Sequence, residues 1–176
     1  MSIDECHYVP ILLAKQGERL ALRDVPHGLR AGFTPLFVVP PIPWDFDGEV
    51  WAKTLDQHLA GVPNELRTAW GTAAAFVDLL FLDDAGALNS GEHPLTWLTS
   101  EANAQGLPLV PVVSPLRTAP YRAAVAAVTA RDQRGACFRL SIPEWPVNLP
   151  GGTDDLLGQI GLVPQQVDLL LDLEVE

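Results

Sequence analysis

Six strand-sized runs of apolar residues recur along the chain, and turn-favouring residues separate them. The runs span 8–14, 34–39, 73–82, 107–113, 136–142 and 167–173. They are almost continuously apolar instead of alternating with polar residues, which is typical of strands covered on both faces. This pattern predicts a buried parallel sheet.

Helical patterns fill the intervals between these runs. We expect helices over 18–23, 51–59, 94–105, 120–131 and 153–160. Trp51, Leu55 and Leu59 form an i, i+4, i+8 stripe, Pro94 suits a first helical turn, and Thr153 is an N-cap candidate. Strands and helices that alternate in this way predict βαβ units.

The length of 176 residues fits one α/β domain over 1–176. One topology is a partial TIM-barrel-like fold of about six βα units, since a complete barrel typically needs ~250 residues. The alternative is an open doubly wound parallel sheet. An apolar strand at 167–173 would form an edge that invites pairing, so we expect either self-association through it or a longer chain that completes the barrel.

The charge balance argues against two classes of partner. Asp and Glu number 22 against 11 Lys and Arg, which gives a formal net charge of -11. A protein that neutralises phosphates would need the opposite sign, so we expect no nucleic-acid partner. We expect no binding to anionic membranes for the same reason. A basic protein partner would suit an acidic surface.

Recognisable cofactor and metal motifs are missing from the sequence. Cys6 and Cys137 lie far apart without a CxxC partner, and the four histidines have no metal-ligand spacing. There is no GxGxxG and no Walker A motif. We therefore expect no cofactor and no metal site. The acidic first residues and the lack of a long apolar segment predict a cytoplasmic protein.

Short motifs along the whole chain resemble the "beta protein" family of bacterial and phage proteins. They lie at 8–18, 34–37, 40–45, 76–78, 93–97, 111–112, 130–132 and 139–140. The family is largely uncharacterised, so the resemblance supplies no reaction. It implies an α/β-barrel protein longer than this chain, and a phage-related role that includes phage–host conflict.

Charged residues occur where the predicted strands end or inside them. In parallel α/β folds, sites lie at the carboxyl ends of strands. Candidate ligand-binding residues are Lys15, Glu18, Asp45, Asp78, Arg139, Asp172 and Glu174. A charge within an apolar strand, as at Asp78 and Arg139, needs either a partner or a function.

Strand alternation indicates how four of these residues would act together. If their faces point into a barrel, Lys15, Asp78, Arg139 and Asp172 converge. Arg139 would hold a carboxylate or phosphate, and Lys15 would supply a charge, base or nucleophile. The two aspartates would act as general acid and base or bind a divalent cation. The alternative is a buried salt-bridge network that satisfies only itself.

Two functions from different classes fit the sequence. The first is an interaction protein, phage-related and without enzymatic activity, that acts through a protein or ligand partner. The second is a TIM-barrel-like enzyme or binder for a polar or anionic small molecule. No catalytic residue can be assigned, and fold alone does not decide between the two.

Overall fold

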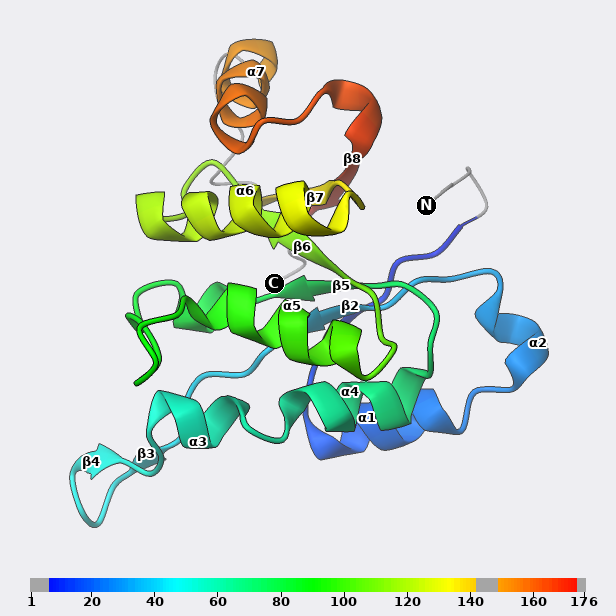
Figure 1. The fold of residues 1–176 in the computed structure, drawn as a ribbon. Helices are drawn as coiled ribbons and strands as arrows, with labels where there is room; N and C mark the ends of the chain where they lie inside the picture. The colour runs from blue at the N-terminus through cyan, green and yellow to red at the C-terminus, as the bar shows by residue number, and fades with distance from the viewer. Residues whose placement is uncertain (1–6, 142–148, 174–176) are drawn as a thin grey trace.

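Six parallel strands form the central sheet of the protein (Figure 1). The structure is a computed structural model that describes residues 7–141 and 149–173. In spatial order the strands are β1 (Ile11–Leu13), β2 (Leu36–Val38), β5 (Ala75–Asp78), β6 (Leu109–Val113), β7 (Ala136–Ser141) and β8 (Val167–Asp172). The predicted α/β class and parallel sheet are confirmed.

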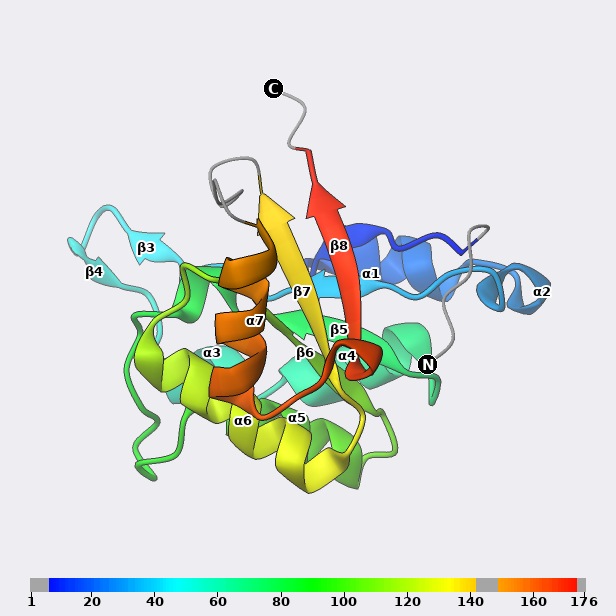
Figure 2. The ribbon, with the colours of Figure 1, turned by 90° about the horizontal axis from the view of Figure 1, so that it is seen from above.

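The strands follow one another across the sheet in the order of the chain, and the sheet curls into a half-barrel (Figure 2). A doubly wound sheet would instead reverse its strand order at a switch point. The helices are α1 (Gln16–Arg23), α2 (His27–Arg30), α3 (Leu55–Leu59), α4 (Val62–Trp70), α5 (Pro94–Ala104), α6 (Ala119–Asp132) and α7 (Leu149–Ile160). Within the described ranges, no helix is long and apolar enough to cross a membrane.

Each face of the sheet buries its own apolar cluster. The larger cluster lies between the sheet and the layer of helices, where α1, α4, α5, α6 and α7 pack in succession. The smaller cluster lies on the opposite face and includes Leu36, Phe76, Val112 and Cys137. Because both faces of the sheet are apolar, the sequence of each strand is a continuous run of apolar residues and does not alternate with polar ones.

All six predicted strands are present, although most are shorter than their apolar runs. The largest difference is at 73–82, where β5 ends at Asp78 and the 3-10 helix η1 (Leu80–Leu82) follows. Leu79 leaves the extended conformation, with φ -98° and ψ 41°. Its apolar side chain is nevertheless buried, so the hydrophobic pattern continues beyond the end of the strand.

Two predicted helices begin four residues away from their predicted starts. The helix predicted from Trp51 is wrong in its first turn, because Thr54 forms a capping box with Gln57 and α3 starts at Leu55. The helix predicted from Thr153 starts earlier, at Leu149, so Thr153 lies inside α7. Pro150 is compatible with this start, since the first turn of a helix leaves its N–H groups unpaired.

The structure also contains elements that we did not predict. Helix α4 buries Leu66 and Trp70 against the core. The proline-rich and acidic segment after β2 forms an antiparallel hairpin of β3 (Trp44–Asp45) and β4 (Val50–Trp51). The formation of such a short hairpin depends on the residues of its turn, so the pattern of apolar and polar residues does not predict it.

Strand β8 is an edge of the sheet. It pairs with β7 along its full length, from Val167 to Asp172. The outward side chains Leu169, Leu171 and Leu173 are exposed. Self-association through this strand stays a prediction.

Candidate functional site

An ion-pair network joins the carboxyl ends of three strands. Asp78 ends β5, Arg139 lies in β7, and Asp172 ends β8. Arg117 joins them from the loop that follows β6. Asp78 is 0% exposed and Arg117 only 5%, so each charge must be compensated within the protein.

The distances show that the four charged side chains pair with one another, while the buried Nε of Arg117 has no hydrogen-bond partner among the described residues. Asp78 lies 2.6 Å from Nη2 of Arg117 and 3.0 Å from Nη1 of Arg139. Arg139 also donates to Asp172 through Nη2 at 2.6 Å and through Nε at 3.0 Å. Burial alone would lower the pKa of Arg139, but the bonds and charges of Asp172 and Asp78 outweigh it and raise that pKa. Three predicted site residues therefore do meet, and they meet as an internal network.

The other predicted residues lie apart from this network. Lys15 is exposed at the N-cap of α1, and its charge acts on the nearby Glu18. Burial raises the pKa of Glu18, and Lys15 opposes this shift. Asp45 lies exposed on the β3–β4 hairpin, where Oδ1 accepts from the N–H groups of residues 47 and 48. Glu174 lies outside the described residues.

Tyr121 connects the network with a neighbouring cavity. Its buried hydroxyl donates to the carbonyl of Val112 and accepts from the N–H of Leu79, both at 3.2 Å. The guanidinium of Arg117 lies 5.2 Å from the centre of the Tyr121 ring. The ring of His93 meets Tyr121 edge-on, with 5.7 Å between the centroids. Burial, above all, raises the pKa of the Tyr121 hydroxyl, which stays protonated.

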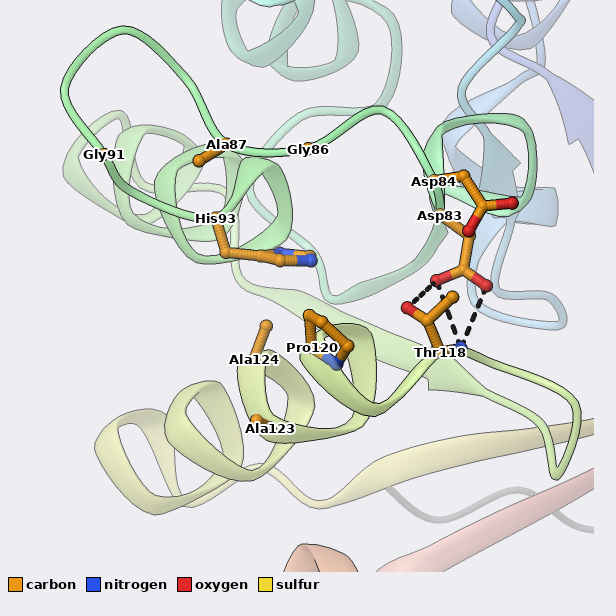
Figure 3. A pocket seen from close by; sticks show the side chains of 10 residues that line it. All are labelled: Asp83, Asp84, Gly86, Ala87, Gly91, His93, Thr118, Pro120, Ala123 and Ala124. Atoms are coloured by element: carbon orange, nitrogen blue, oxygen red, sulfur yellow. Dashed lines mark hydrogen bonds between the residues drawn. The ribbon is translucent and has the colours of Figure 1, made fainter.

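The cavity beside Tyr121, here called the His93 cavity, has a volume of about 630 Å³ (Figure 3). It lies between the β5–α5 loop and the first turns of α6. Its lining consists of Asp83, Asp84, Gly86, Ala87, Gly91, His93, Thr118, Pro120, Ala123 and Ala124. Most of these side chains are small, so the walls leave room for a ligand.

His93 presents a defined hydrogen-bond donor to this cavity. Its Nδ1 accepts from the N–H of Leu95 at 3.1 Å and so caps α5. The proton of the neutral ring therefore resides on Nε2. Burial lowers the pKa of His93, and the charge of Asp83 opposes this shift only in part. The ring points into the cavity above Pro120 (Figure 3).

Asp83 and Asp84 form the acidic side of the cavity. The carboxylate of Asp83 accepts hydrogen bonds from Thr118, and that of Asp84 accepts none from the described residues. Asp83 accepts from the hydroxyl of Thr118 at 2.7 Å and from its N–H at 3.1 Å. Asp84 is exposed, and no residue of the described chain donates a hydrogen bond to its side chain. The lining contains no lysine or arginine.

Sequence reasoning did not predict this cavity as a site. It did predict a helix that begins at Pro94, directly after His93, and this start is confirmed. Thr118 also caps a helix, α6, by accepting from the N–H of Tyr121. Two helix caps at the carboxyl ends of neighbouring strands were the available signal. Among the described residues, no group of His, Cys, Asp or Glu is arranged to hold a metal ion.

Comparison with known proteins identifies one relationship. The model of a protein family described as Beta protein matches residues 8–176. No curated protein and no solved structure matches the chain. The match covers the whole half-barrel, including the network and the His93 cavity.

Proposed function

The chain belongs to the Beta protein family, and we propose that it binds a small polar molecule in the His93 cavity. The single observation that carries this proposal is the Nε2–H donor of His93, fixed by the cap on Leu95 and directed into the cavity. Ligands of parallel α/β folds bind at the carboxyl ends of strands, which is where this cavity lies.

The lining favours a neutral or cationic ligand over an anionic one. An acceptor atom of the ligand would receive the Nε2–H of His93, and its hydroxyl or ammonium groups would donate to Asp84. The walls of glycine, alanine and proline would enclose a small carbon skeleton. An anionic ligand would face two carboxylates without a cation in the lining.

A TIM-barrel-like architecture is part of the same proposal. Three features support it: the strand order along the chain, the succession of helices on one face, and a cavity at the carboxyl ends of the strands. In such folds, the loops after the strands change with the ligand while the barrel stays constant.

The test is saturation-transfer NMR with small molecules that differ in charge: neutral amides and polyols, primary amines, and carboxylates. We expect saturable binding within the neutral or amine group and none for the carboxylates. His93→Asn retains an acceptor for the cap but removes the imidazole, and Ala123→Leu fills the cavity. Each should weaken binding at least about tenfold.

His27→Asn is the matched control, because His27 is exposed on α2, outside the cavity lining. It should bind as the unchanged protein does. The proposal is wrong if no molecule of the neutral or amine group binds, or if His93→Asn and Ala123→Leu bind as well as the control.

A further inference from the structure

The β3–β4 hairpin exposes a cluster of large apolar side chains. Figure 1 shows the hairpin projecting from the body of the protein. Trp44 is 41% exposed, Phe46 84% and Trp51 61%. Scattered apolar residues are normal on a surface, but aromatic side chains gathered within eight positions indicate an interaction surface. We call these three residues the aromatic tip.

Contacts within the hairpin and at its base position the two tryptophans of the aromatic tip. Trp44 and Trp51 pair across the two strands, and their rings meet edge-on with 5.0 Å between centroids. At the base, Ile42 packs on the core, and the ring of His58 is hydrogen-bonded to the carbonyl of Pro40 at 2.9 Å. A surface that is ordered before binding loses little conformational entropy when a partner arrives.

The charges around the tip select the kind of partner. Asp45, Asp47 and Glu49 lie between the two tryptophans, and Lys53 follows them. Asp47 and Glu49 are exposed and form no ion pair within the described part of the chain. This carboxylate cluster repels anionic surfaces and attracts cations at short range.

We propose that the aromatic tip binds an arginine-bearing segment of a partner protein. A guanidinium can lie over an indole ring while it pairs with a neighbouring carboxylate, which an ammonium does less well. The tip offers both groups within a few residues. This surface is separate from the His93 cavity, so either can fail experimentally without the other.

The test uses the full chain and a fluorescein-labelled peptide of alternating arginine and alanine, (Arg-Ala)4-Arg, followed by anisotropy at physiological ionic strength. We expect saturable binding of this arginine peptide. The same peptide with lysine in place of arginine should bind several-fold more weakly, and the one with glutamate in place of arginine should not bind. The double variant Phe46→Ala/Trp51→Ala should lose at least about tenfold in affinity. Asp47→Asn/Glu49→Gln should lose about threefold or more.

The matched control removes two exposed acids elsewhere, Glu101→Gln on α5 and Asp155→Asn on α7. It should change the affinity less than about twofold. Thermal unfolding checks that every variant is folded. The proposal is overturned if the control weakens binding as much as Asp47→Asn/Glu49→Gln, because diffuse charge would then explain the affinity.

Two other occupants would also overturn the proposal. One is a second copy of this chain, which sedimentation would show as a dimer that Trp51→Ala dissociates. The other is a lipid surface, which would show as binding to phosphatidylcholine vesicles that displaces the arginine peptide. The proposal requires that the aromatic tip does not mediate dimerisation and that vesicles do not displace the arginine peptide.

Discussion

The two polar regions at the carboxyl edge of the sheet differ in how their hydrogen-bonding groups are used. In the ion-pair network, Arg139 directs all three of its nitrogens to aspartates. In the His93 cavity, the Nε2 of His93 and the carboxylate of Asp84 have no hydrogen-bond partner among the described residues. In the first arrangement the charged groups compensate one another, and the second leaves groups available to a ligand.

This contrast changes the interpretation of buried charge in the chain. A charged residue inside an apolar strand is an obvious candidate for a functional site, yet Asp78 and Arg139 form an ion pair with each other. The groups better suited to a ligand are less conspicuous in the sequence, because they are helix caps and small loop residues. Variants that change stability and ligand binding separately test this difference between the two regions.

The largest expected effect is that of Asp78→Ala. It should cost about 3–5 kcal/mol of unfolding free energy, because it leaves the buried guanidinium of Arg117 without its carboxylate. Urea denaturation measures the change. Asp84→Ala is the control at the same edge of the sheet, and it should stay within about 0.5 kcal/mol because Asp84 is exposed. Equal effects of the two variants would remove the contrast.

The next effect is that of Tyr121→Phe, at the residue between the two regions. The variant keeps the ring against Arg117 and His93 but leaves the N–H of Leu79 without its acceptor. We expect a loss of about 1–3 kcal/mol in the free energy of unfolding. Tyr8→Phe, at an exposed tyrosine, should change stability by less than about 0.5 kcal/mol. A loss confined to ligand binding would instead assign Tyr121 to the cavity alone.

A smaller effect is expected for Thr118→Ala. The hydroxyl of Thr118 caps α6 and donates to Asp83, so its removal should cost about 1 kcal/mol in thermal or urea unfolding. Thr118→Ser keeps the hydroxyl and should restore most of the stability. If Thr118→Ser is as unstable as Thr118→Ala, the packing of the methyl group, and not the hydrogen bonds, stabilises this wall of the cavity.

Much of the fold follows from the sequence, because it depends on local pattern. Each of the six apolar runs contains a strand, and Asp78, Arg139 and Asp172 lie together as strand alternation and the rule on carboxyl ends predict. Lys15, which was predicted to join them, is instead exposed at the N-cap of α1. Asp45 obeys the same rule but lies elsewhere, because the chain after β2 forms a hairpin before it reaches α3. The periodicity of a strand does not indicate the course of the loop that follows it.

The His93 cavity could not be predicted for a related reason. His93 and Thr118 each have a sufficient local explanation as helix caps. Their joint position depends on how α5 and α6 pack against each other, and this packing is a tertiary property. Gly86 and Gly91 also have positive φ angles of 78° and 84°, so the loop between them takes a course that apolar periodicity does not encode.

The smallest expected effect is the pH dependence that His93 contributes. Burial lowers the pKa of the folded imidazole below its ordinary value of 6.5. Between these two values the unfolded chain binds more protons, so the free energy of unfolding falls as the pH falls through this window. As the pH falls through this window, the unchanged protein should therefore lose more free energy of unfolding than His93→Asn does.

Thermal unfolding of the unchanged protein and of His93→Asn at a series of pH values measures this difference. If the two proteins show the same pH dependence, the pKa of His93 is the same in the folded and unfolded chains. The ring would then take up a second proton as readily as an exposed histidine does. Below its ordinary pKa of 6.5 the cavity would then contain a charged imidazolium, and its preference for neutral or cationic ligands over anionic ones would weaken in that pH range.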